Sequence, residues 1–137
     1  MEIRALGPGD DAAVVAAQHL FDGPAKTDAT ARFLAEPGSH LLIGYVEREP
    51  AGFVSGVEVT HPDKGTEMFL YELAVDEAHR RRGHARALIG ALEALARERG
   101  CTGMFVFVDD DNEAGRAAYR SAGGADASRP WMVDWTF

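Results

Sequence analysis

The segment that decides the fold is LAVDEAHRRRGHARALI, residues 73–89. An apolar run ends at Val75, a polar loop follows, and apolar residues then recur at helical spacing until Gly100 supplies a stop: Ala85, Leu88, Ile89, Leu92, Leu95 and Ala96. This order predicts a strand, an arginine-rich turn around Gly83 and an amphipathic helix. A helix N-terminus offers unpaired N–H groups and a positive dipole end, so the turn is a candidate polyphosphate cradle. A solvated basic turn is the alternative reading of the same residues.

The flanking sequence predicts a mixed α/β chain of α+β type. Before the decisive segment we expect a strand at 2–6, helices at 12–21 and 28–35, a hairpin of strands at 40–47 and 51–59, and a central strand at 67–75. After it we expect a buried strand at 103–108, a helix at 112–122 and a last strand at 131–135. The strand–helix–strand unit in the second half implies one parallel crossover.

Length and charge limit the function classes. The chain has 137 residues, enough for a single domain over 1–137, and its 14 Lys and Arg against 22 Asp and Glu give a formal net charge of -8. A net-negative surface repels nucleic acid and attracts cationic small molecules. The apolar stretches are too short to span a bilayer, and the N-terminus lacks a signal-peptide pattern, so no membrane association is expected.

Cysteine and histidine usage gives little sign of redox or metal chemistry. Cys101 is the single cysteine, so no intrachain disulfide can form, which fits a reducing cytoplasm. The five histidines show no metal-ligand spacing, and we therefore expect no metal site.

Two motifs carry a family resemblance. No Walker A loop or dinucleotide-binding glycine motif is present. Arg80-x-x-Gly83-x-Ala85 instead resembles the pyrophosphate-binding R/Q-x-x-G-x-G/A motif of the GNAT N-acetyltransferases, and Asn112-x6-Tyr119-x3-Gly123 resembles the second motif of that family. The resemblance covers roughly residues 40–124 well and implies a GNAT fold, a central twisted mixed sheet with helices on both faces. Gly124 departs from it, because the family usually has an aromatic residue there.

Within that superfamily the chain is most similar to small aminoglycoside 3-N-acetyltransferases. The similarity rests on four stretches: Tyr71–Val75, Glu77–Gly83, Asp109–Asp111 and Asp134. It implies transfer of the acetyl group of acetyl-coenzyme A to a polycationic amine, most simply an aminoglycoside, with antibiotic resistance as the consequence. A polyamine or protein-amine acetyltransferase and a non-catalytic acyl-coenzyme A-binding module are the alternatives, and a homodimer is compatible with the resemblance.

The resemblance also implies which residues hold the cofactor. The pyrophosphate would lie on the arginine-rich turn and the first turn of its helix: Arg80, Arg81, Arg82, Gly83, His84, Ala85 and Arg86. The backbone groups of Leu73 and Val75 would pair with the pantetheine arm, with Ala74 between them as a further cofactor-binding residue, and the Val75 N–H would serve as the oxyanion donor. The side chains of Leu73 and Val75 are expected to be simple core residues.

Catalytic roles follow from what amine acetylation requires: an uncharged amine and a protonated leaving thiolate. Tyr119 is the expected proton donor to the thiolate, and Asn112 either binds the cofactor or caps its helix. Asp109 is the first candidate base, because burial at a strand end would raise its pKa, and Glu72 is the second. The same two carboxylates and three others are candidate acceptor-binding residues: Asp110, Asp111 and Asp134. A solvated, helix-capping turn is the simpler reading of the acidic run 109–111.

Overall fold

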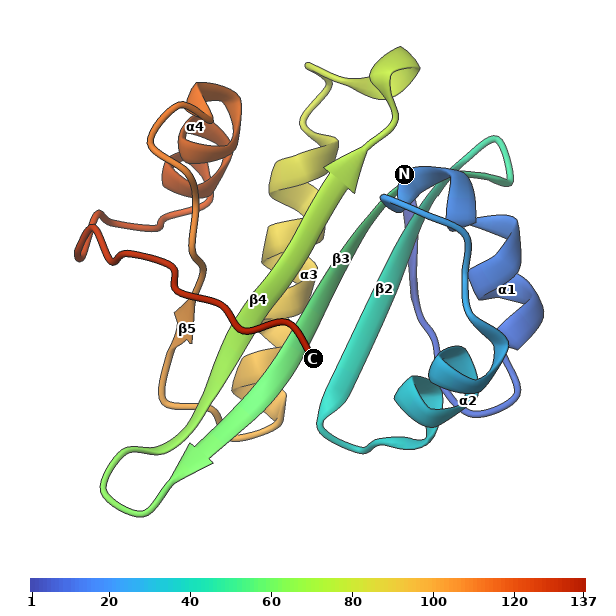
Figure 1. Cartoon of the computed structure of the whole chain (residues 1–137). Coiled ribbons are helices and arrows are strands. Elements are labelled where there is room, and N and C mark those ends of the chain that lie inside the picture. Colours follow the sequence, from blue (N-terminus) through green and yellow to red (C-terminus); the bar gives the residue numbers. More distant parts are fainter.

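A five-stranded mixed sheet forms the centre of the computed structural model, which describes residues 1–137, and its strands follow chain order β1-β2-β3-β4-β5 (Figure 1). The strands are β1 (Glu2–Ala5), β2 (Ser39–Val46), β3 (Glu49–His61), β4 (Gly65–Val75) and β5 (Met104–Phe105). The first four pair antiparallel, and β5 pairs parallel with β4. The α-helices are α1 (Asp11–Ala16), α2 (Thr27–Ala35), α3 (His84–Glu98) and α4 (Glu113–Ser121). The predicted mixed sheet and its parallel crossover are confirmed.

Helices cover both faces of the sheet because side chains alternate along β2 and β3. Leu41, Ile43 and Phe53 join one apolar cluster with residues of α1 and α2. Their neighbours Leu42 and Val54 point the other way and join a second cluster with α3. Figure 1 shows α1 and α2 beside β2 on one side and α3 behind β3 and β4 on the other.

The N-terminal half departs from the expected ranges at element ends and within the first helix. Helix α1 stops at Ala16 and continues as a short 3₁₀ helix, η1 (Gln18–Leu20), so the helix expected at 12–21 is broken in two. The hairpin turn is tighter than expected, since Glu47 and Arg48 alone connect β2 to β3 with φ angles of 50° and 71°. Two positive φ angles match the strand twist in a two-residue hairpin.

The C-terminal strands were predicted wrongly. The buried strand expected at 103–108 shrinks to Met104–Phe105, because β5 pairs with β4 only at Met68 and Phe69. Beyond that point the chain leaves the sheet, and Phe107 is 63% exposed. The strand expected at 131–135 does not form, and Trp131 within it is 94% exposed. A strand needs a partner edge, and two residues of β5 offer too short an edge for one. No helix of the chain is both long and apolar enough to cross a membrane.

Candidate active site

The arginine-rich turn presents the N-terminus of α3 without a side-chain cap. Gly83 occupies the N-cap position with a φ of 81°, the left-handed region that favours glycine. A Cβ placed there would meet no atom within 4 Å, so the space in front of the turn is open. No side chain caps the helix, and its first turn, which contains His84, Ala85 and Arg86, therefore leaves backbone N–H groups free. N–H groups without a partner at a helix N-terminus can hold an anion.

The arginines of the turn divide into one that braces the backbone and others that lie free. Arg80 Nε donates a hydrogen bond to the Val75 carbonyl oxygen at 3.1 Å, which ties the turn to the end of β4. Arg81 and Arg82 are exposed, and Arg81 has a left-handed φ of 61°. Burial, helped by the N-terminal ammonium and then by His79 and Arg82, lowers the pKa of His84. A neutral His84 in this setting leaves the positive potential to the arginines and the helix.

A β-bulge in β4 sets the direction of Glu72. In the register with β3, Ser55 faces Glu72 but Gly56 faces Leu70, so Tyr71 is the extra residue. The Glu72 N–H donates to the Ser55 hydroxyl oxygen at 3.2 Å in place of a backbone carbonyl. The bulge lies just past the last β4 residue that pairs with β5, Phe69. The unpaired edge of β4 therefore begins close to the bulge that contains Tyr71 and precedes Glu72.

The second half of β4 keeps one edge unpaired. The Asp76 N–H donates to the Ala51 carbonyl oxygen on β3 at 2.8 Å. Backbone groups alternate in direction along a strand, so Ala74 also faces β3, whereas Leu73 and Val75 present their N–H groups to the open edge. The side chains of Leu73 and Val75 pack against the α3 core, as predicted. The two residues expected to pair with pantetheine, Leu73 and Val75, therefore both have an N–H group on the unpaired edge, although the Val75 carbonyl oxygen already accepts from Arg80.

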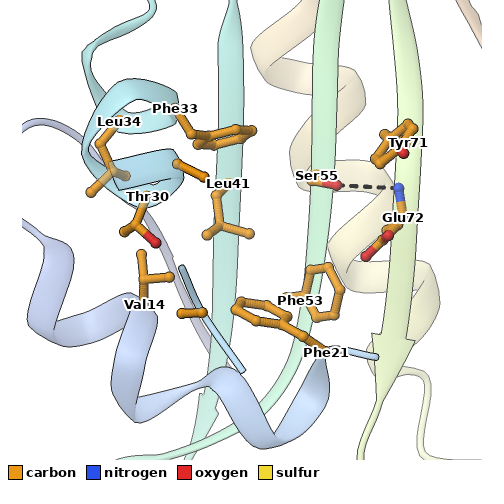
Figure 2. A pocket seen from close by; sticks show the side chains of 12 residues that line it. Val14, Phe21, Thr30, Phe33, Leu34, Leu41, Phe53, Ser55, Tyr71 and Glu72 are labelled. Carbon is orange, nitrogen blue, oxygen red and sulfur yellow. Dashed lines mark hydrogen bonds between the residues drawn. The ribbon is translucent and has the colours of Figure 1, made fainter. Parts of the chain in front are cut away.

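Glu72 lies in an apolar pocket between the sheet and α2 (Figure 2). The pocket has a volume of about 260 Å³ and is lined mostly by apolar side chains: Val14, Phe21, Ala25, Ala29, Thr30, Phe33, Leu34, Leu41, Phe53, Ser55 and Tyr71 besides Glu72. Figure 2 shows the Glu72 carboxylate extending from β4 toward the aromatic side chains. Burial raises the pKa of Glu72, and the nearby charge of Asp22 raises it further. A carboxylate with a raised pKa is a better proton acceptor.

Tyr119 lies on the other side of the sheet from Glu72. It lies on α4, is half-buried and packs against the α3 core. Burial raises the pKa of the Tyr119 phenol, so the hydroxyl stays protonated near neutral pH. Tyr119 lines a cleft of about 1180 Å³ between β5, α4 and the C-terminal residues. Glu72 and Tyr119 therefore line separate pockets on opposite sides of the sheet, Glu72 beside α2 and Tyr119 beside α4.

Asn112 acts as a helix cap. Its Oδ1 accepts a hydrogen bond from the Gly115 N–H at 2.9 Å, so of the two roles expected for it the cap is the one formed. A Cβ at Gly115 would lie 2.6 Å from Asn112 Nδ2, which explains the glycine. Gly124 has a similar reason, since its Cβ would lie 3.0 Å from the Tyr119 carbonyl oxygen and leave little room for an aromatic residue.

The acidic run lies apart from Glu72. Asp109, Asp110 and Asp111 are exposed in the loop before α4, and none lines the Glu72 pocket. The expectation that Asp109 ends a buried strand is wrong, because β5 ends at Phe105 and Asp109 is exposed. Asp109 and Asp110 line the cleft of Tyr119 instead. Asp134 lies in the exposed C-terminal residues that form no strand.

One acidic residue escaped the sequence analysis. Asp22 follows η1 in a loop that the Gln18 side chain holds, since Gln18 Oε1 accepts from the Ala25 N–H at 3.0 Å. The loop brings Asp22 close enough to Glu72 to raise the pKa of Glu72. The sequence Asp22-Gly23-Pro24 reads only as a helix stop, and no motif connects it to a residue fifty positions away. No group of three metal-ligating side chains converges anywhere in the chain.

Comparison with known sequences gives a family match over most of the chain. A sequence model described as the Acetyltransferase (GNAT) family matches residues 13–123. Human N-acetyltransferase 8 is 27% identical over 110 residues, which is 80% of this chain and 48% of that protein. The L-2,4-diaminobutyric acid acetyltransferase of Streptomyces coelicolor is 34% identical over 73 residues, 53% of this chain and 42% of that protein. The chain spans about half the length of these curated relatives.

Solved structures share the fold. An aminoglycoside acetyltransferase from an uncultured soil metagenomic sample, in complex with sisomicin, has a TM-score of 0.91 at 18% identity, with 99% of this chain and 95% of that chain covered. The aminoglycoside N-acetyltransferase AAC(6′)-Iy, in complex with the bisubstrate analogue CoA-S-monomethyl-acetylneamine, has a TM-score of 0.83 at 19% identity, with 99% and 98% covered. At these identities the likeness concerns the fold alone.

Proposed function

This chain belongs to the GNAT acetyltransferase family, and from that premise we propose that it transfers the acetyl group of acetyl-coenzyme A to the primary amine of a cationic small molecule. Acetyl-coenzyme A supplies a thioester. The amine nitrogen attacks its carbonyl carbon, and the coenzyme A thiolate leaves. The chain must then hold the pyrophosphate, present an oxyanion donor, remove a proton from the amine and return one to the thiolate.

The residues fit acetyl-coenzyme A at two places. The uncapped N-terminus of α3 and the open space in front of Gly83 suit a pyrophosphate, with Arg81 and Arg82 adding positive charge. The free N–H groups of Leu73 and Val75 suit the amide groups of a pantetheine arm laid along the open edge of β4. Arg80 takes a positioning role, because its guanidinium is already bonded to the Val75 carbonyl oxygen.

Three groups would then share the chemistry. Glu72 accepts a proton from the substrate ammonium on the α1–α2 side of the sheet, and the Val75 N–H donates to the oxygen that becomes negative as the amine attacks. Tyr119 donates its phenolic proton to the departing thiolate from the α4 side. The observation that carries the proposal is the bulge, because it lies where β4 stops pairing with β5, and Glu72 at this bulge lines the pocket on the α1–α2 side. We therefore place Glu72 ahead of Asp109 as the base.

A thiol-release assay tests the proposal. The protein is mixed with acetyl-coenzyme A and a panel of alkylamines, diamines, aminoglycosides and peptides, and free thiol is followed together with the acetylated product. Amine-dependent release that falls in Glu72→Gln and Tyr119→Phe supports it. Tight binding of coenzyme A without turnover of any amine would favour a non-catalytic acyl-coenzyme A-binding module.

An aminoglycoside is a second, more specific candidate acceptor. The net charge of -8 and the exposed acidic run 109–111 favour a polycation, and the fold is shared with an enzyme whose structure holds sisomicin. Acetylation at the 3-N position, as the sequence resemblance implies, would be read from the product by NMR. Protection of a susceptible bacterium by the expressed protein would test the implied resistance. The pocket around Glu72 favours a different acceptor body, as argued next.

A further inference from the structure

The pocket that receives Glu72 has one charged end and apolar walls. Phe21 and Phe53 meet edge to face with ring centroids 4.9 Å apart, and Phe33 and Leu41 line the same space (Figure 2). Glu72 is the single charged residue in the lining. The Ser55 hydroxyl oxygen accepts a hydrogen bond from the Glu72 N–H, and the other hydroxyl groups in the lining are those of Thr30 and Tyr71.

We propose that the acceptor is a primary monoamine on an apolar body, an alkylamine or an arylalkylamine, with its nitrogen at Glu72 and its body in this pocket. The proposal rests on the proposed N-acetyltransferase function and names its substrate class. Apolar cavities of about 150 Å³ hold a benzene ring, so a pocket of about 260 Å³ has room for a ring with a short chain. Ligand pockets generally combine apolar walls with a few polar groups that fix orientation.

Polycations and sugars fit this pocket poorly for a physical reason. The far ammonium group of a diamine would face aromatic and aliphatic side chains with no carboxylate to pair it. The many hydroxyl and amino groups of an aminoglycoside ring would lose their water partners and find only the hydroxyls of Ser55, Thr30 and Tyr71 in the walls. The one additional carboxylate near Glu72 is Asp22, which is exposed and does not line the pocket. Negative charge is therefore confined to the end at which the reacting nitrogen lies.

Hexylamine and 1,6-hexanediamine form a matched pair for the test, because they differ mainly in the far ammonium group. With saturating acetyl-coenzyme A, we expect kcat/KM for hexylamine to exceed that for hexanediamine by at least about tenfold, since pocket mismatches discriminate by factors of this order or more. 2-Phenylethylamine should resemble hexylamine, and gentamicin should be poorer than both. Preference for hexanediamine or gentamicin overturns the proposal and leaves N-acetyl transfer intact.

A charge added to the wall gives an independent test. Ala29 is exposed in the first turn of α2 and lines the pocket, and an acidic residue is stabilising there, so Ala29→Asp should fold. The ratio of kcat/KM for hexanediamine over hexylamine should rise at least about tenfold, or roughly 1.4 kcal/mol, in Ala29→Asp but not in Ala29→Asn. An unchanged ratio in Ala29→Asp overturns the proposal.

The proposed acetyltransferase function and the proposed substrate class can be refuted by different results. Absence of turnover with every amine would refute the proposed function, and the substrate class is then decided by calorimetric binding of the same two amines to the protein. Tighter binding of hexylamine, reversed in Ala29→Asp, supports the pocket assignment. Equal or tighter binding of hexanediamine contradicts it.

Discussion

Two glycines at opposite ends of α3 provide a test of the pyrophosphate site and a matched control for that test. Gly83 at the N-cap and Gly100 beyond the C-terminus have φ angles of 81° and 78°, and a Cβ at either would meet no atom within 4 Å. Substitution by alanine therefore causes the same backbone strain at both positions and no clash at either. Only Gly83 lies where coenzyme A is expected to bind.

The magnitude follows from the left-handed conformation. An L-residue in that region costs roughly 1–2 kcal/mol. If the free protein relieves this strain by changing the conformation of residue 83, the fraction able to bind falls by about 5–30-fold, and the dissociation constant rises by the same factor. Gly83→Ala should weaken coenzyme A binding by that factor, and Gly83→Val, with its branched side chain in the open space, should weaken it further.

Isothermal titration calorimetry with coenzyme A measures the affinity, and thermal unfolding measures the strain. Gly100→Ala should lower the melting temperature about as much as Gly83→Ala and leave coenzyme A affinity at the wild-type value. An equal loss of affinity in both variants would mean that stability alone is responsible. Unchanged affinity in a folded Gly83→Val protein would refute the phosphate-site assignment.

Three further predictions concern single side chains. Tyr119→Phe should lower kcat by about 10²-fold or more with coenzyme A affinity retained, because it removes a proton donor; a parallel loss of affinity in calorimetry would contradict this. Glu72→Gln should raise the melting temperature at pH 7 by a few degrees at most. The pKa of Glu72 is raised in the folded protein, so the folded state loses stability as the carboxyl ionises with rising pH, and glutamine avoids this loss. The gain should vanish below about pH 4, where the carboxyl is protonated in both the folded and unfolded states, and a gain that persists there would count against burial as the cause. Asn112→Ala should cost about 1 kcal/mol of stability with coenzyme A affinity kept, and a loss of affinity without a loss of stability would return Asn112 to the cofactor site.

Local sequence patterns were sufficient for the strand–turn–helix unit. The apolar period of α3, the glycine at each end and the strand that ends at Val75 are all encoded within thirty residues, and each is confirmed. The role of Asn112 was left open because capping and ligand binding use the same side-chain oxygen. The hydrogen bond to Gly115 identified the cap.

The remaining features depended on long-range contacts. An apolar run such as 103–108 reads as a buried strand, but the number of residues that pair depends on when β5 diverges from β4. The alternating sequence around Trp131 is typical of a strand, but it pairs with no strand of the sheet, and Trp131 is exposed. Glu72 and Asp22 come together through the packing of the loop after η1 over the sheet, and the bulge at Tyr71 appears only in the register of β3 and β4. These contacts moved the preferred base from Asp109 to Glu72.

The pH dependence of kcat/KM for hexylamine at saturating acetyl-coenzyme A, compared between wild type and Glu72→Gln, tests most directly whether Glu72 takes the proton from the amine. Ionisation of the amine affects both proteins equally, so the difference between their two pH profiles reports the ionisation of Glu72. Wild type should lose activity toward acid through the raised pKa of Glu72, and Glu72→Gln should lack that step and be about 10²–10⁴-fold slower at neutral pH. Asp109→Asn should keep the wild-type profile. Full activity in Glu72→Gln together with loss of activity in Asp109→Asn would contradict the account and return the base to Asp109.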